Sequence, residues 1–129
     1  MDGTNIQKLT TLSYYAAPYA LIYEQVNNLL IWIDDMDYAI KYLNLSSIES
    51  GAQKFKSVHI HRPFELAVHG DYLYWTDSAD GSTGGIFRMH LKGDRRYVTE
   101  TVQSGLIQAE GIASLDANYV PGKTHIFLR

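Results

Sequence analysis

The chain of 129 residues contains no cysteine, so no disulfide can hold it together and its core must come from apolar packing. Small secreted domains often depend on disulfides, so this absence alone gives no support to an extracellular location. No apolar run approaches the roughly 18 residues that a membrane-spanning helix needs. Met1 is followed by Asp2-Gly3-Thr4 rather than by a signal peptide. We therefore expect no direct membrane insertion by this segment.

The chain has no large excess of positive or negative charge. A formal net charge of −3 and a pI near 5.9 give no electrostatic case for binding nucleic acid or an anionic membrane. Proline is scarce, with three residues, whereas ten tyrosines and ten glycines favour strands joined by turns. Helical periodicity is not sustained anywhere, which indicates an all-β fold.

The most informative stretch is Tyr72–Asp77, an apolar and aromatic run of strand-forming residues that ends in a carboxylate. A weaker copy, Leu29–Asp34, lies 43 residues earlier and repeats the tryptophan and the final aspartate. Pro63 corresponds in the same way to Pro18, 45 residues before it. Repeats of about 40 to 50 residues with strand and turn content are typical of propellers and related arrays.

The hydrophobic runs and turn residues predict the individual strands. In the first repeat they cover residues 19–23, 29–34, 38–45 and an outer strand that ends near Val58. In the second repeat they cover residues 64–68, 72–77, 86–91 and 95–102, with a flexible loop over 80–85. Residues 6–12 are predicted as a further strand, and 109–113 and 124–128 as the start of another unit.

Tyr74-Trp75-Thr76-Asp77 spells a family tetrapeptide, and the chain resembles the YWTD β-propeller, the class B repeat region of the low-density lipoprotein receptor family, over nearly its whole length. The resemblance implies a six-bladed ring with four antiparallel strands in each blade. At about 43 residues per unit such a ring needs on the order of 260 residues. We therefore expect a partial six-bladed propeller of about two and a half to three blades, as a segment of a larger protein.

The expected division makes the whole of 1–129 a single incomplete propeller segment. Its parts are an outer strand of a preceding blade (1–13), two complete blades (14–58 and 59–103) and the first strands of a third blade (104–129). The resemblance also accounts for the missing cysteines, since this family concentrates them in flanking modules.

The repeated residues are predicted to be structural. They are Trp32, Asp34, Tyr74, Trp75, Thr76 and Asp77. Because side chains alternate along a strand, Trp75 and Asp77 share one face and Tyr74 and Thr76 the other, and both faces are apolar enough to be buried. A carboxylate at a strand end can accept several backbone N–H bonds. The resemblance implies that these aspartates tie the blades together.

Three residues are singled out for other chemistry. His59 and His61 alternate on a predicted strand, so both imidazoles would lie on one face, as a metal pair requires, but no third ligand accompanies them. We expect no metal and no cofactor, and we retain a pH-sensing role for this pair, since histidine titrates near neutral pH and receptors of this family use propeller histidines to release ligands in acid. Asn44-Leu45-Ser46 is an N-glycosylation sequon.

The function that the resemblance implies is non-catalytic. The chain would be part of the extracellular region of a plasma-membrane receptor that binds protein or lipoprotein ligands for endocytosis or signalling, with epidermal-growth-factor-like modules beside it. One alternative is a metal-dependent six-bladed hydrolase of the lactonase kind, for which Glu110 is the one suitable residue. Another is a secreted matrix adhesion propeller similar to that of nidogen.

Overall fold

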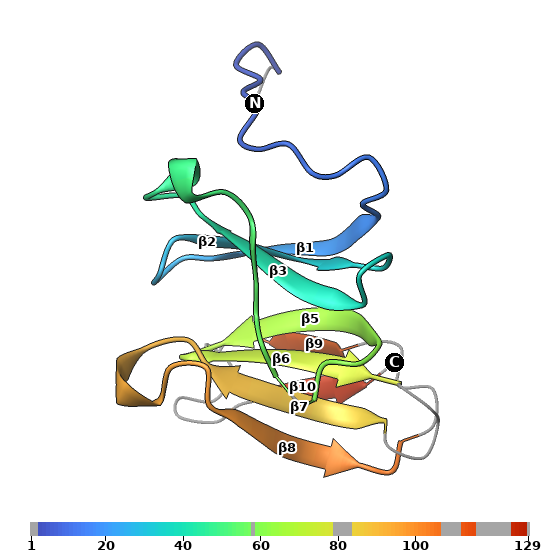
Figure 1. Ribbon diagram of the computed structural model, residues 1–129. Coiled ribbons are helices and arrows are strands. Elements are labelled where there is room, and N and C mark those ends of the chain that lie inside the picture. The colour runs from blue at the N-terminus through green and yellow to red at the C-terminus, as the bar shows by residue number, and fades with distance from the viewer. Residues whose placement is uncertain (1–2, 58, 79–83, 107–111, 116–124, 129) are drawn as a thin grey trace.

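The computed structural model describes residues 3–57, 59–78, 84–106, 112–115 and 125–128. Within these residues the chain is all-β, which confirms the predicted class: ten strands form two four-stranded sheets and one two-stranded sheet. Figure 1 shows the two larger sheets stacked on one another, with the smaller sheet against the second. Apolar and aromatic residues at alternating positions build these strands, and short turns connect them.

The first sheet is an antiparallel meander whose spatial order follows the chain. Its strands are β1 (Pro18–Glu24), β2 (Leu29–Asp34), β3 (Ala39–Asn44) and β4 (Gln53–Lys54). A short 3₁₀ helix, η1 (Ile48–Ser50), precedes β4. The predicted second strand is therefore correct to the residue, whereas the outer strand contains only two paired residues.

The second sheet repeats this topology. Its strands are β5 (Pro63–His69), β6 (Tyr72–Asp77), β7 (Gly85–His90) and β8 (Thr99–Ser104), with the 3₁₀ helix η2 (Gly93–Arg95) before β8. The third sheet contains β9 (Ile112–Leu115) and β10 (His125–Leu128), paired antiparallel. The first strands of successive sheets are neighbours, because β5 contacts both β1 and β9.

The two larger sheets agree in their backbone hydrogen bonds as well as in strand order. At one end, the residue after the second strand donates to the carbonyl of the residue before the first-strand proline: Asp35 to Ala17 at 3.1 Å, and Ser78 to Arg62 at 3.2 Å. At the other end, Leu45 donates to Asn28 at 2.9 Å, and Leu91 to Asp71 at 2.8 Å. The register of the first two strands shifts soon after the proline in both sheets. The sequence repeat is thus a structural repeat.

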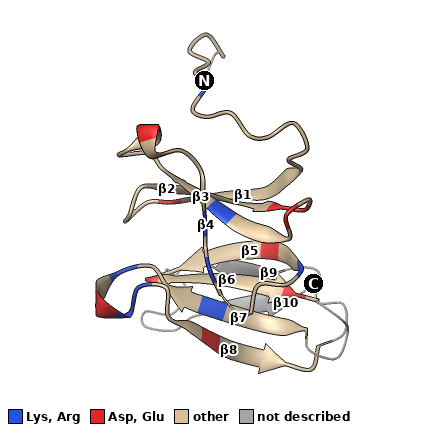
Figure 2. Cartoon of the chain, viewed as in Figure 1, with Lys and Arg blue, Asp and Glu red and all other residues tan. Residues whose placement is uncertain are grey.

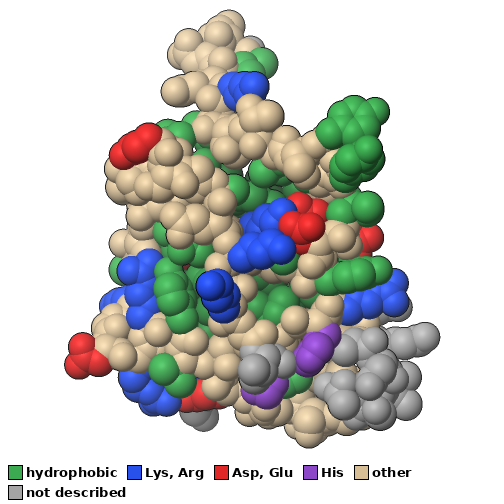
Figure 3. Space-filling model, viewed as in Figure 1, with side chains coloured by type: hydrophobic (Ala, Val, Ile, Leu, Met, Phe, Trp, Pro, Cys, Tyr) green, Lys and Arg blue, Asp and Glu red, His purple; other side chains and the backbone are tan. Residues whose placement is uncertain are grey.

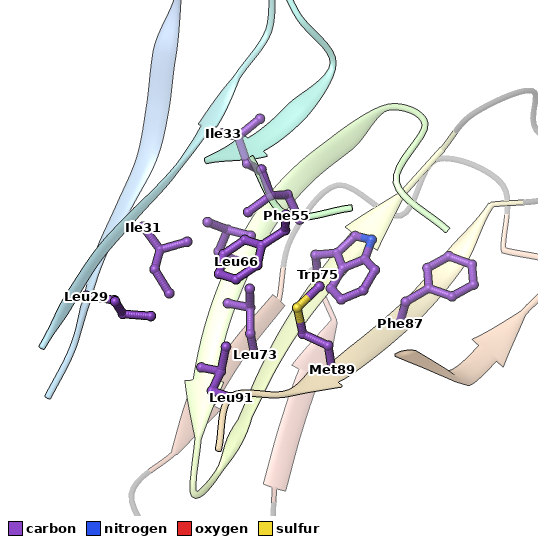
Figure 4. Packing of buried hydrophobic residues seen from close by; sticks show 11 residues of the cluster. Leu29, Ile31, Ile33, Phe55, Leu66, Leu73, Trp75, Phe87, Met89 and Leu91 are labelled. Atoms are coloured by element: carbon purple, nitrogen blue, oxygen red, sulfur yellow. The ribbon is translucent and has the colours of Figure 1, made fainter. Parts of the chain in front are cut away.

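The sheets pack with the same orientation at both interfaces. The face of the first sheet that carries Leu29, Ile31 and Ile33 packs on the second sheet, against Leu66, Leu73, Trp75 and Met89. Figure 4 shows these two groups facing one another. The opposite face of the second sheet, which carries Tyr74, Ala67 and Ile86, packs on Ile112 of β9. Tyr74 and Ile86 occupy the positions that correspond to Ile31 and Ile40, so each sheet presents the same face to the sheet that follows it.

Two strand predictions were wrong. Residues 6–12 form no strand: Ile6 is 91% exposed, and no described strand lies beside this segment to complete a ladder. The predicted outer strand over 95–102 begins later, at Thr99, because η2 and the left-handed residue Tyr97 (φ 66°) extend the turn after β7.

The loop predicted over 80–85 was also partly wrong. Gly85 is the first residue of β7, paired with Asp77 and Ser104. A Cβ at this position would meet the Gln103 carbonyl, so glycine permits the close approach of β8 there. Residues 79–83 lie outside the described part of the chain.

Candidate functional site

Each of the two repeated aspartates binds the backbone just before the first strand of its own sheet. Asp34, 1% exposed, accepts hydrogen bonds from the backbone N–H groups of Ala17 (3.1 Å) and Met36 (3.2 Å). Asp77, also 1% exposed, accepts from His61 (2.8 Å) and Arg62 (3.1 Å). The prediction that a strand-end carboxylate satisfies several backbone donors is therefore correct. Ala17, His61 and Arg62 belong to the segments that enter the first strands, so each carboxylate fixes the path of the chain into its sheet.

The two repeated tryptophans are both buried, but only one of them is fully bonded. Trp75 is inaccessible to solvent, and its indole Nε1 donates to the carbonyl of His59 at 3.1 Å. Trp32 is 3% exposed, and its Nε1 has no hydrogen-bond partner among the described residues. A buried donor without an acceptor costs free energy. Among the described residues, the first sheet thus offers its tryptophan no acceptor that corresponds to the His59 carbonyl.

The residues around Trp32 form an apolar face on the side of the first sheet that points away from the second sheet. This face lines a pocket of about 260 Å³, whose residues are Thr10, Leu12, Pro18, Tyr19, Leu21, Leu30 and Trp32. Leu21 is 62% exposed, whereas Leu66, the corresponding residue of the second sheet, is 4% exposed. On the second sheet, the corresponding face is covered by the first sheet. On the first sheet, this face is covered only in part, by the segment that contains Thr10 and Leu12.

A half-buried lysine of β3, Lys41, joins the end of the second strand to the following turn. Lys41 Nζ lies 2.7 Å from Asp34 Oδ2 and 2.6 Å from Asp37 Oδ2, and Lys54 lies 3.4 Å from Asp37. Burial works against the charge of Lys41, but its hydrogen bonds to the two carboxylates outweigh burial and raise its pKa. Burial likewise acts to raise the pKa of Asp34, yet the hydrogen bonds from Lys41 and Ala17 lower it overall. The residue pattern of the sequence did not indicate this cluster.

A second ion pair, also missed, lies across β7 and β8. Arg88 and Glu100 are direct cross-strand partners, and Arg88 donates to Glu100 at 2.8 Å. Arg88 also lies over the Tyr72 ring, at 4.2 Å. A hydrogen bond with Tyr74, opposed by burial and aided by Glu100, raises the pKa of Arg88. Figure 2 shows acidic and basic residues interspersed over the described elements. The register of the hairpin, once known, would have indicated this pair.

The prediction for the histidine pair was wrong in its local structure. Residues 59–61 precede β5 and are not a strand. The backbone cannot join a ladder there, because the His59 carbonyl accepts from Trp75 and the His61 N–H donates to Asp77. The His59 ring stacks on Phe87 at 4.8 Å, and His61 is exposed. Among the described residues no group of three or more His, Cys, Asp or Glu side chains could hold a metal ion.

The other predicted residues divide between core and surface. Tyr74 (3% exposed) and Thr76 (fully buried) lie in β6, and the Thr76 hydroxyl has no hydrogen-bond partner among the described residues. Asn44 ends β3 and is half-buried. Glu110 lies outside the described residues. In the part of the chain that is described, no helix is both long and apolar enough for a membrane span.

Large apolar side chains are exposed at the end of the first sheet where Asp34 lies. Tyr14 and Tyr15 are 93% and 72% exposed and contact each other edge to face, at 5.2 Å. Met36 and Tyr38, in the turn between β2 and β3, are 59% and 53% exposed. The hydrogen bond from Asp35 to Ala17 joins this turn to the segment with the two tyrosines. Figure 3 shows hydrophobic side chains protruding on one side of the molecule, below the N-terminal segment.

No protein-family model matches the chain. Among curated proteins it is similar to Protein cueball of Drosophila yakuba, with 30% identity over 79 residues, 60% of this chain and 12% of that protein. It is also similar to Protein cueball of Drosophila pseudoobscura pseudoobscura, with 26% identity over 130 residues, 91% of this chain and 19% of that protein. The chain thus spans only 12% to 19% of the length of these relatives.

Proposed function

We propose that the chain is a non-catalytic segment of a six-bladed YWTD β-propeller in the extracellular region of a receptor similar to the low-density lipoprotein receptor. The two four-stranded sheets would be two of its blades, and β9 with β10 the beginning of a third. The sequence repeat of Leu29–Asp34 and Tyr72–Asp77, at the second strand of each sheet, supports the assignment. The length of the curated relatives supports a larger protein around this segment.

The observation that carries the proposal is the orientation of the interfaces. In each of the two larger sheets, the face with Ile31 or Tyr74 packs on the sheet that follows in the chain. The face with Trp32 or Trp75 points the other way, towards what precedes it in the chain. Such head-to-tail contacts do not end with a pair, because one unused face of each kind always remains, and they close only as a ring. The sheets also contact through their first strands, β1, β5 and β9, as units arranged around an axis would. The open face around Trp32 would then receive a preceding blade.

The proposed mechanism is rigid display of loops. The second strands, β2 and β6, are largely buried and hydrogen-bonded on both edges, whereas the residues at the Asp34 end of the first sheet expose four large apolar side chains, on Tyr14, Tyr15, Met36 and Tyr38. Tyr38 holds a left-handed conformation (φ 49°), which costs a non-glycine residue on the order of 1 kcal/mol. Exposed aromatic residues on a rigid scaffold are typical of surfaces that bind other proteins. This end of the sheet is therefore the proposed contact surface for an extracellular protein or lipoprotein.

The proposal can be tested with cells that display the longer protein containing this segment, with fluorescent low-density lipoprotein as the probe. We expect the combined change Tyr14→Ser, Tyr15→Ser and Met36→Ser to lower lipoprotein binding several-fold at equal surface expression. The matched control replaces Tyr23 and Val26, exposed apolar residues (54% and 65%) at the other end of the sheet, with serine. Absence of lipoprotein binding, or equal binding by both variants, contradicts the proposed role.

A further inference from the structure

Asn44-Leu45-Ser46 is the only Asn-X-Ser/Thr triplet in the sequence, and the display function does not use it. It lies at the end of the first sheet away from Asp34, where β3 ends and the chain turns towards η1. The corresponding residues of the second sheet are His90-Leu91-Lys92, which offer no acceptor asparagine. The triplet is thus a feature of one sheet and no part of the structural repeat.

The asparagine side chain has its oxygen engaged and its nitrogen available. Asn44 Oδ1 accepts a hydrogen bond from the backbone N–H of Ser46 at 2.9 Å, and the bond is exposed. Asn44 Nδ2 makes no hydrogen bond within the described residues. Ser46 is exposed, and its hydroxyl accepts from Asn28 Nδ2 at 2.9 Å. The group that a glycan would modify therefore has no competing partner.

Two large apolar side chains, those of Tyr23 and Val26, are exposed at this end of the first sheet. Tyr23 donates its hydroxyl to Asn28 at 3.0 Å, and Asn28 in turn donates to Ser46, so the three residues are linked. Tyr23, in β1, is 54% exposed, and Val26, in the turn between β1 and β2, is 65% exposed. A bulky, solubilising glycan at the neighbouring asparagine would cover such side chains. It would also leave the opposite end, with Tyr14 and Tyr15, free.

From this arrangement we infer that Asn44 is an N-glycosylation site that shields this end of the first sheet. The inference rests on the proposed extracellular function, because the donor, an oligosaccharide on a lipid pyrophosphate, belongs to the secretory pathway. In the transfer, Asn44 Nδ2 forms a bond to the anomeric carbon of the sugar. The bond from that carbon to the pyrophosphate oxygen breaks, and its electron pair leaves with the lipid pyrophosphate. One Nδ2 proton goes to a base of the transferase, and Asn44 keeps the other.

The test is translation of the full chain behind a cleavable signal sequence in the presence of microsomes. We expect protease-protected chains to carry one glycan, seen as a single mass increase that a peptide glycosidase reverses with conversion of Asn44 to aspartate. Asn44→Gln and Ser46→Ala should each abolish the increase, Ser46→Thr should preserve it, and the control Asn28→Gln, which changes an asparagine outside a sequon, should leave it intact.

Because transfer is read on translocated chains, the result does not depend on whether a variant folds. Protected chains of the unaltered sequence that carry no glycan overturn the inference. So does a glycan that persists after Asn44→Gln. The outcome is separate from that of the proposed function, since the lipoprotein experiment compares residues at the other end of the sheet. A glycosylated chain that binds no lipoprotein would refute the display role and leave the glycan site standing.

Discussion

Two tryptophans at the same position of the repeat differ by one hydrogen bond, and this difference should be measurable. Trp75→Phe removes the bond to the His59 carbonyl, whereas Trp32→Phe removes a buried donor that has no partner among the described residues. The loss of aromatic area is the same in both. We expect Trp75→Phe to lower the free energy of unfolding by about 1 kcal/mol more than Trp32→Phe does.

Urea denaturation of the two variants measures the difference through the midpoint and slope. Equal losses would indicate that the indole of Trp32 already has an acceptor in solution. A larger loss for Trp32→Phe would contradict the assigned hydrogen bonding.

The roles of single residues were predictable where one residue type has few uses. Asp34 and Asp77 follow apolar strands, and a carboxylate there has little to do except accept nearby N–H groups, as both do. His59 was harder, because its backbone carbonyl rather than its imidazole makes the main polar contact. A side-chain pattern carries no information about which carbonyl will meet an indole from another strand.

At the scale of secondary-structure elements, Lys41 of β3 connects two strands and a turn through its carboxylate partners. Lys41→Met would leave Asp34 with only backbone donors, and it would leave Asp37 with the more distant Lys54. Losing hydrogen bonds between charged groups costs about 1.5–3 kcal/mol. We expect a loss of that order at neutral pH. Lys54→Met should cost about 0–1 kcal/mol, because Lys54 is 53% exposed.

Lys41→Met should also change how the stability of the fold depends on pH. The pKa of Asp34 and that of Asp37 are lowered in the folded chain, so the unfolded chain binds protons more readily in acid. Their contribution is present above the ordinary aspartate pKa of about 4 and is lost as the pH falls through the lowered values. Without Lys41 this loss should begin at higher pH. Acid titration followed by circular dichroism measures the midpoint, and an unchanged midpoint in Lys41→Met would contradict the assignment.

Strand positions followed from the sequence best where both faces of the strand are buried. The bounds of β2 and β6 were predicted to the residue, because in each of them five consecutive apolar, aromatic or β-branched residues are followed by an aspartate that ends the run. The outer strands were predicted poorly. β4 and β8 are polar, and their position depends on the 3₁₀ helices and on left-handed residues such as Tyr97, whose side chain gives no sign of this conformation.

The segment 6–12 shows a further limit. Its β-branched residues Ile6, Thr10 and Thr11 suit a strand, yet a strand exists only where a neighbour accepts its hydrogen bonds. Within the described residues no strand pairs with 6–12, so the segment is not part of a sheet. Local pattern predicts the propensity, and tertiary contact decides whether it is realised.

At the scale of the whole molecule, the like-oriented stacking of sheets gives two leucines very different surroundings. Leu66 lies between the sheets and is 4% exposed, while Leu21, at the same position of the repeat, is 62% exposed. We expect Leu66→Ala to lower the free energy of unfolding by about 2–5 kcal/mol, as truncations of buried leucine do. Leu21→Ala in the same chain should change it by no more than about 0.5 kcal/mol.

The comparison becomes decisive when both substitutions are made in the longer protein. If a preceding blade packs on the face with Trp32, Leu21 is buried there and its truncation should cost about as much as that of Leu66, which thermal unfolding of the displayed region would reveal. The ratio of the two losses, rather than either alone, is the measured quantity, because it cancels differences between the two chains. A cost for Leu21→Ala that stays small in the longer protein, beside a large cost for Leu66→Ala, would mean that nothing packs on this face and that the stack of sheets ends at the first one.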